Sequence, residues 1–119
     1  MWRALRAVLI IFACFGAACL LSASGARSAT HVHTVLIQGF QFQPDSLTIA
    51  EGDTVEWKNA DIVPHTVTAG DQTFHSPLIQ PNHSWKMVAS KPGTYSYFCT
   101  PHPNMKGKLV ITQTTGKGR

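Results

Sequence analysis

The amino-acid sequence predicts an all-β fold, and three observations lead to that prediction. Residues 30–119 are built from short segments in which apolar and polar residues alternate, which is the pattern of half-buried strands. Turn-forming residues separate these segments, and no segment reads as a convincing helix. Six to eight short strands in about 90 residues indicate a β-sandwich or a small barrel.

The first half of this region contains three expected strands. HTVLIQGF (33–40) alternates and forms the first of them. SLTIAEGDTVEWKN (46–59) reads as a strand, a turn at 51–53 and a further strand. Val55 and Trp57 fall on one face of that further strand, because successive side chains of a strand point to opposite faces.

The second half contains four more expected strands and one long loop. HTVTA (65–69) is a short strand that ends in a Gly-Asp turn. The segment 71–84 reads as a loop, because two prolines interrupt it. WKMVAS (85–90), TYSYFC (94–99) and KLVIT (108–112) are strand-like, and a Lys-Pro-Gly turn separates the first two.

The N-terminal residues do not belong to this pattern. Two arginines precede the apolar and small-residue run AVLIIFACFGAACLL (7–21), and SASGARSA follows it, which is the layout of a secretory signal peptide. We therefore expect a signal peptide at 1–29 and one domain at 30–119. Candidate cleavage points lie after Ser24, Ala26 and Ala29. Two alternatives stay open: the uncharged run is just long enough to span a bilayer, and a lipid-modified Cys19 would make an anchor.

Removal of the leader changes both the charge and the cysteine content. The whole chain has a net charge of +4, whereas residues 30–119 hold seven basic and six acidic residues and a net charge of +1. A charge so close to zero gives no case for nucleic-acid binding. Cys14 and Cys19 leave with the leader, so Cys99 is the single thiol of the expected domain. Such a thiol is either a buried inert side chain or a reactive or metal-bound thiolate.

The stretch CTPHPNMKG (99–107) carries the chemistry. Cys99, His102 and Met105 form a C-x2-H-x2-M arrangement, and His65 in IVPHTV is the best candidate for a further donor. Taken singly these residues have ordinary explanations, because a lone histidine or methionine is more often structural and zinc motifs normally supply paired cysteines. Together, one thiolate, two imidazoles and a thioether are the donors of a blue-copper electron-transfer site. We therefore predict metal ligands at all four positions.

On these residues the sequence resembles the cupredoxins, the small blue copper proteins. FQPDSLTIAEGDTVEWKNAD looks like the first half of that family, VPHTV resembles its first-ligand segment, and PGTYSYFCTPHPNMKGKLVI resembles its ligand loop. The resemblance covers about 80 residues, from Val35 to Thr112. The short loop with its two prolines is most similar to the loop of the amicyanins.

The resemblance implies a Greek-key β-sandwich of about eight strands that holds one type 1 copper ion per chain. The implied copper ligands are His65, Cys99, His102 and Met105. The sequence departs from the family at Thr66, where many members have an asparagine that ties the two ligand-bearing loops together. A hydroxyl can make part of that link.

The resemblance also implies a periplasmic one-electron carrier that works between redox partners. Pro101 and Pro103 stiffen the loop around His102, and we expect redox proteins to dock near these three residues. Similarity to the amicyanins suggests a dehydrogenase as electron donor and a cytochrome as acceptor, although no residue of the chain identifies either. We expect a monomer with no nucleic-acid partner and no membrane span after cleavage.

Two other functions compete with electron transfer as explanations of these residues. A periplasmic copper carrier or scavenger hands on its metal; such proteins tend to be rich in methionine or histidine, whereas the expected domain has only Met87 and Met105. Two histidines and one cysteine can also hold catalytic zinc, but no H-E-x-x-H motif is present. Phe98 and Thr100 flank Cys99 at positions where a multicopper oxidase has histidines. We therefore predict that the chain is not an enzyme.

The remaining histidines are expected to be solvated and are His31, His33, His75 and His83.

Overall fold

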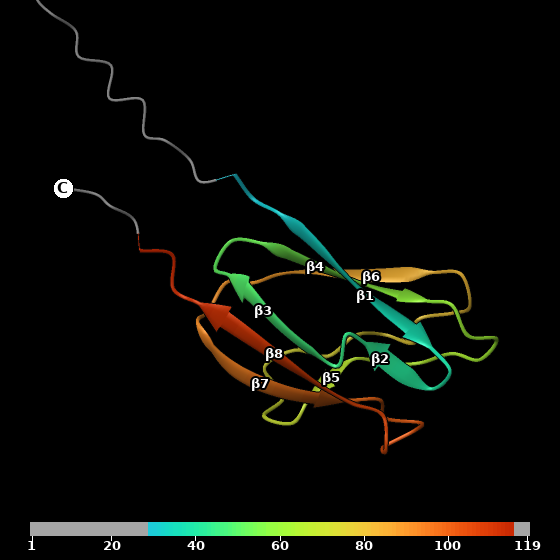
Figure 1. Ribbon diagram of the computed structural model, residues 1–119. Coiled ribbons are helices and arrows are strands. Elements are labelled where there is room, and N and C mark those ends of the chain that lie inside the picture. The colour runs from blue at the N-terminus through green and yellow to red at the C-terminus, as the bar shows by residue number, and fades with distance from the viewer. Residues whose placement is uncertain (1–28, 116–119) are drawn as a thin grey trace, which may run out of the picture.

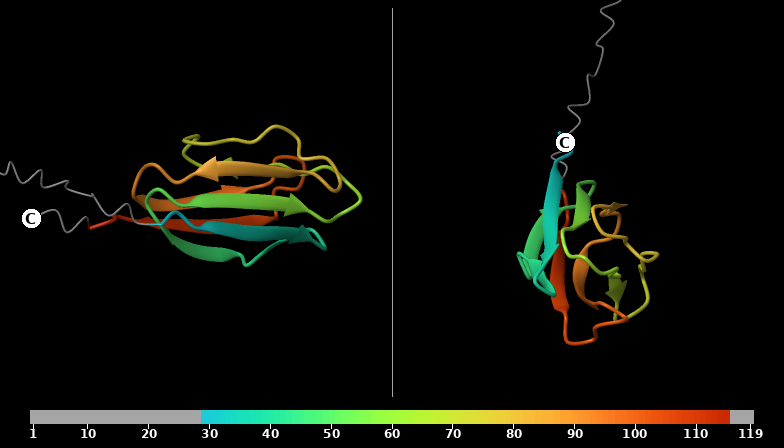
Figure 2. Two further views of the ribbon diagram at one scale, coloured as in Figure 1. Left: turned by 90° about the horizontal axis from the view of Figure 1, so that it is seen from above. Right: turned by 90° about the vertical axis from the view of Figure 1, so that its right-hand side faces the viewer.

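The computed structural model describes residues 29–115, which form two stacked β-sheets (Figures 1 and 2). Within that range there are eight strands and no helix. In chain order the strands are β1 (Val32–Gln38), β2 (Gln41–Gln43), β3 (Ser46–Ala50), β4 (Thr54–Asn59), β5 (Thr68–Ala69), β6 (Ser84–Val88), β7 (Gly93–Phe98) and β8 (Lys106–Thr112). One sheet has the order β2-β1-β4-β6 and the other β3-β8-β7-β5. The predicted all-β sandwich is confirmed.

Both sheets are mixed, because strands that are distant in the sequence pair in parallel. β1 runs parallel to β4, with Val35 opposite Trp57, and β3 runs parallel to β8, with Leu47 opposite Leu109. The remaining pairs are antiparallel, including β7 with β8. Figure 1 shows the loop between β7 and β8 at the end of the sandwich that lies away from the start of β1.

The hydrophobic core lies between the two sheets and follows from the alternation in the strands. Val35 and Ile37 of β1, and Val55 and Trp57 of β4, face inward and are at most 1% exposed. Leu109 of β8 meets them from the other sheet and is also buried. Burial of each such side chain contributes roughly 1.5–3 kcal/mol relative to its exposure to water. This core holds the two sheets together and provides the rigid frame for the loops at its ends.

The strand predicted at 33–40 ends earlier than the sequence indicated. Gly39 and Phe40 have φ angles of 62° and 56° and form a two-residue turn into β2, a strand that the sequence analysis missed. Turns with positive φ at both central residues match the right-handed twist of a hairpin. Phenylalanine rarely adopts positive φ, so Gly39 is the one residue of this turn that its sequence marks as turn-forming.

The strand predicted at 65–69 is largely replaced by irregular structure. Only Thr68–Ala69 forms a strand, β5, and His65 makes an isolated bridge with Ile79 instead. The segment 71–84 is a loop up to the start of β6, as predicted, and two isolated bridges tie it to the chain around β5. His65 is therefore held by a loop that packs back on it.

No helix in residues 29–115 has the length and apolar character needed to cross a bilayer. The predicted signal peptide, its cleavage points and the alternative lipid anchor at Cys19 concern residues outside the described range, apart from Ala29. The division of the chain into a leader and one domain stays a prediction.

Candidate metal centre

Three side-chain donors that are far apart in the sequence meet at one end of the sandwich. Cys99 Sγ lies 3.6 Å from His65 Nδ1 and 3.7 Å from His102 Nδ1. The two Nδ1 atoms are 3.2 Å apart. Cys99 and His65 have no exposed surface, whereas His102 is half-buried. Among residues 29–115 these three form the one group of histidine, cysteine and acidic side chains with the proximity needed to hold a metal ion.

The spacing and the chemistry of the three donors fit a copper ion. Ligand bonds of about 2.0–2.3 Å to nitrogen and sulfur, arranged around one centre, place three ligand atoms about 3.5–3.7 Å from one another. The observed separations of 3.2, 3.6 and 3.7 Å are close to that range. A thiolate is a soft ligand that suits Cu(I), and imidazole suits both oxidation states of copper. The group can therefore accept copper with little movement of the protein.

Met105 is placed beside the three donors by backbone hydrogen bonds. Its N–H donates to the carbonyl of His102 over 2.9 Å, and its carbonyl accepts from the N–H of Cys99 over 3.1 Å. These two bonds fold the segment from Cys99 to Met105 into a compact turn. The Met105 side chain is buried. All four predicted ligand residues thus lie in one region, and the donor atoms of three of them lie within 4.8 Å of one another.

The framework around the site positions its donors from two sides. Cys99 directly follows β7, so the sheet sets the place of the sulfur. His65 exchanges two backbone hydrogen bonds with Ile79, of 3.2 and 2.8 Å. Asn59, the last residue of β4, donates through Nδ2 to the carbonyls of Val63 and Ile79, each over 2.8 Å. The loop that carries His65 is therefore fastened to the end of a core strand.

Thr66 links the two ligand-bearing loops. Its Oγ1 accepts a hydrogen bond from the Thr100 N–H over 2.8 Å and lies 3.0 Å from Thr100 Oγ1. Its own N–H points at Cys99 Sγ over 3.4 Å. A pair of hydroxyl groups thus links the two loops at the position where the resemblance led us to expect an asparagine. A backbone donor to the sulfur stabilises negative charge there.

Asp61 and Phe40 complete the surroundings of the histidines, and no sequence motif indicated a role for either residue. Asp61 Oδ2 lies 2.8 Å from His65 Nε2, and both carboxylate oxygens accept N–H groups of the turn at Gly39 and Phe40. Burial raises the pKa of the Asp61 carboxyl, but the N–H donors of Phe40 and Gly39 and the His65 imidazole outweigh it and leave the pKa below its usual value. The only signal available was that Asp61 lies four residues before His65.

The surface around the site is apolar. His102 reaches the surface between Pro101 and Pro103, which are both exposed. Phe40, Ile62 and Leu78 are exposed by 49%, 93% and 53%. Phe40 contacts the imidazoles, Ile62 belongs to the loop that leads to His65, and Leu78 precedes the residue that pairs with His65. These exposed side chains therefore belong to the end of the molecule that holds the donors.

The other histidines lie outside this group. His75 and His83 are exposed, as expected. His33 differs from the expectation, because it is half-buried and its Nε2 lies 2.9 Å from Asp53 Oδ2. The N–H of His31 donates to the other oxygen of Asp53 over 3.1 Å. The Asp53 carboxylate therefore ties the start of β1 to the turn between β3 and β4.

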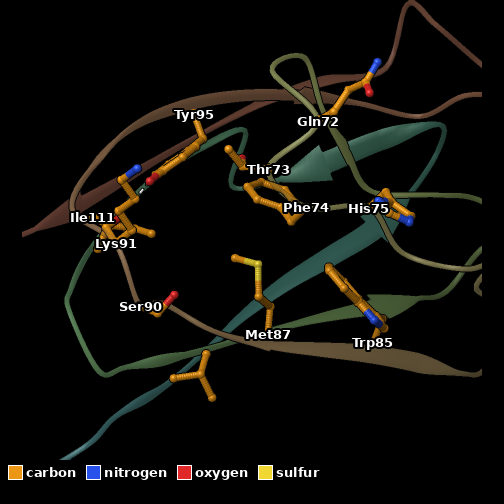
Figure 3. Close-up of a pocket in the computed structure, with 11 residues that line it drawn as sticks. Gln72, Thr73, Phe74, His75, Trp85, Met87, Ser90, Lys91, Tyr95 and Ile111 are labelled. Carbon is orange, nitrogen blue, oxygen red and sulfur yellow. Dashed lines mark hydrogen bonds between the residues drawn. The ribbon is translucent and has the colours of Figure 1, made fainter.

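A cavity of about 570 Å³ opens between the sheet edges, and Figure 3 shows Phe74, Tyr95, Met87 and Trp85 around it. None of the four predicted ligands lines this cavity. It is separate from the donor group and supplies no part of the candidate metal centre.

Comparison with known proteins shows to which family the chain is similar. The family model of the Cupredoxin-like domain matches residues 8–111. Amicyanin-alpha of Methylorubrum extorquens is 35% identical over 82 residues, which are 65% of this chain and 69% of that protein. Amicyanin of Paracoccus denitrificans is 31% identical over 93 residues, 74% of this chain and 71% of that protein. Plastocyanin of a Synechococcus strain is 35% identical over 88 residues, 59% of this chain and 62% of that protein.

Solved structures give the same result. The Cu(I) form of an amicyanin mutant aligns with a TM-score of 0.65 and 32% identity over 74% of this chain and 89% of that chain. The oxidised state of another amicyanin mutant aligns with a TM-score of 0.65 and 30% identity over the same shares. The sequence-based resemblance, including its closeness to the amicyanins, is confirmed. The chain belongs to the cupredoxin-like domain family.

Proposed function

We propose that the chain is a blue copper protein that carries one electron at a time between redox partners. The observation that carries the proposal is the buried thiol of Cys99 between the Nδ1 atoms of His65 and His102. Membership of the cupredoxin-like family, with amicyanins and plastocyanins among the relatives, indicates a blue copper electron carrier. Together with the donor group, it also confirms the predicted copper cofactor.

The copper ligands in this proposal are His65, Cys99, His102 and Met105. When bound, copper supplies the one-electron change between Cu(I) and Cu(II). The protein holds the donors in nearly the same place throughout: Cys99 follows a core strand, and the compact turn from Cys99 to Met105 is closed by backbone hydrogen bonds. A site that rearranges little loses little energy to reorganisation when the electron moves.

We further propose that redox proteins dock on the apolar surface around His102, next to Pro101 and Pro103. An exposed apolar surface with few charges suits brief contacts with a partner. The half-buried imidazole of His102 gives the shortest route from the donor group to a docked protein. Phe40 and Ile62 extend this surface beyond the loop. A dehydrogenase donor and a cytochrome acceptor remain part of the proposal by similarity alone.

The location and the assembly state belong to the same proposal. Export by the leader at 1–29 would bring the domain to the periplasm as a monomer. The family relationship to electron carriers supports a protein that turns over no substrate and is therefore not an enzyme.

The test is an optical spectrum of the oxidised, copper-loaded chain. We expect an intense blue band from charge transfer between the Cys99 sulfur and copper, and we expect Cys99→Ser to abolish it. Met87→Leu is the control, because Met87 lines the distant cavity and should leave the band unchanged. A colourless protein with full copper occupancy would contradict the proposal. Loss of copper during reduction and reoxidation would favour a copper carrier instead.

A further inference from the structure

The carboxylate of Asp61 accepts three hydrogen bonds that join two separate segments. Oδ1 accepts the N–H of Gly39 over 2.7 Å, and Oδ2 accepts the N–H of Phe40 over 3.0 Å. The same Oδ2 lies 2.8 Å from His65 Nε2. Asp61 is itself held in place, since its N–H donates to Asn59 Oδ1 over 2.9 Å. Its side chain is 11% exposed, and the two hydrogen bonds from the turn lie at the surface.

The hydrogen bond to Asp61 determines which nitrogen of His65 carries the proton. An ionised carboxylate only accepts hydrogen bonds, so Nε2 of His65 must be the donor. In a neutral imidazole the other nitrogen then has a free lone pair. That other nitrogen is Nδ1, which faces Cys99 Sγ and His102 Nδ1. The proton position that Asp61 imposes is therefore the one that a metal ligand at Nδ1 requires.

The same carboxylate holds an aromatic ring against both histidines. Phe40 has a φ of 56°, which side-chain-bearing residues rarely adopt. Two hydrogen bonds from the turn to Asp61 offset this unfavourable backbone conformation. In that conformation the Phe40 ring packs edge-on against His65 at 5.4 Å and against His102 at 4.9 Å, measured between ring centroids. The ring thus restricts both imidazoles at their outer side.

We propose that Asp61 is a positioning residue that holds His65 in its ligating tautomer and, through the turn at Gly39 and Phe40, fixes the orientation of both histidine ligands. This inference deepens the proposed copper site and rests on it. It assigns to one half-buried carboxylate the role of joining the β1–β2 hairpin to the metal centre. Asp61 does not contact the metal position; it acts through His65 and Phe40.

The first experiment uses the copper-free chain and ¹⁵N NMR of the histidine rings. In the unmodified chain we expect His65 in a single tautomer with the proton on Nε2. Asp61→Asn should give a mixture of tautomers, because an amide offers one acceptor oxygen in place of two. Asp61→Glu keeps the charge and should restore most of the Nε2–H tautomer. Asp71→Asn is the matched control. This substitution removes the same charge, but from a carboxylate whose hydrogen bonds come from the N–H and the hydroxyl of Thr73.

The second experiment measures copper binding and the reduction potential of the same variants. Asp61→Asn should weaken copper affinity by about 10- to 100-fold, the usual effect of losing the partner of a ligand histidine. It should also raise the potential, because a negative charge that stabilises Cu(II) is lost. Asp71→Asn should change both much less. If Asp61→Asn keeps the tautomer, the affinity and the potential, the inference is wrong.

Phe40→Asn separates the ring from the carboxylate. Asparagine tolerates positive φ, so the turn and its bonds to Asp61 should persist and His65 should keep its tautomer. The His102 ring should become more mobile by NMR relaxation. An unchanged His102 would refute the role of the ring. If Asp61→Asn does not fold, the unmodified copper-free chain decides, because a mixture of His65 tautomers there would overturn the inference. A colourless copper-loaded wild-type chain would contradict the proposed function, while the NMR of the copper-free chain would still decide the role of Asp61.

Discussion

Replacement of Thr66 by valine tests how the two ligand-bearing loops are joined. Valine has nearly the shape of threonine, so the change removes the hydroxyl and leaves packing almost unaltered. The structure shows two hydrogen bonds that would be lost, the bond from the Thr100 N–H at 2.8 Å and the hydroxyl contact with Thr100 at 3.0 Å, together with a longer contact of 3.4 Å with Thr68 Oγ1. Thr66 itself is only 6% exposed.

The magnitude follows from these two bonds. A neutral hydrogen bond contributes about 0.5–1.5 kcal/mol net, so we expect Thr66→Val to lower the free energy of unfolding by about 1–3 kcal/mol. Thr100 is exposed, so water can partly replace the lost acceptor, which favours the lower half of that range. Thr66→Ser keeps the hydroxyl and should cost less than Thr66→Val.

The assay is urea denaturation of the copper-free chain, with Thr68→Val as the matched control. Thr68 Oγ1 has one long contact of 3.4 Å with Thr66 Oγ1, so its loss should cost less than about 0.5 kcal/mol. In the copper-loaded chain, Thr66→Val should also shift the blue band, because the loop that holds Cys99 loses its anchor. Equal stabilities for the Thr66 and Thr68 variants, together with an unchanged band, would refute the reasoning.

Three further predictions concern the thioether, the packing of β8 and the acid stability. Met105→Gln should retain copper and lower the reduction potential, because an oxygen donor favours Cu(II). Voltammetry measures the potential, and an unchanged value would show that Met105 is not a ligand. Gly107→Ala should destabilise the chain by about 3 kcal/mol in thermal or urea unfolding, since the added methyl would collide with the buried Tyr97 ring; a normal stability would mean that this ring moves freely. The hydrogen bond from the His31 N–H lowers the pKa of the Asp53 carboxyl most, and the hydrogen bond with the His33 side chain lowers it further. Burial has the opposite, smaller effect. The stabilisation from Asp53 is therefore present above its unfolded pKa of about 4 and is lost as the pH falls through its lower folded pKa. Asp53→Asn should flatten the acid side of a plot of melting temperature against pH. An unaltered plot would contradict this role of Asp53.

Local sequence patterns determined much of the fold. Alternation with a period of two residues depends only on neighbouring positions, so the inward faces of β1 and β4 could be read directly, as for Val55 and Trp57. The spacing from Cys99 to Met105 also lies within one loop, where chain connectivity alone keeps the residues close. His65 could be named because it precedes a strand-like segment and supplies the missing donor type.

The tertiary structure alone decided how the donors are supported. Asp61 meets Gly39 and Phe40, which lie more than twenty positions earlier, and Thr66 meets Thr100, which lies 34 positions later. The contact of Asp61 forms because the parallel pairing of β1 with β4 brings the hairpin beside the His65 loop, and the contact of Thr66 forms because β5 pairs with β7. No local periodicity encodes such a meeting of loops, and Phe40 adopts its positive φ in a turn whose N–H groups donate to Asp61. The sequence by itself therefore predicted which residues could bind copper, whereas the packing of distant loops determined the orientation and the surroundings of these residues.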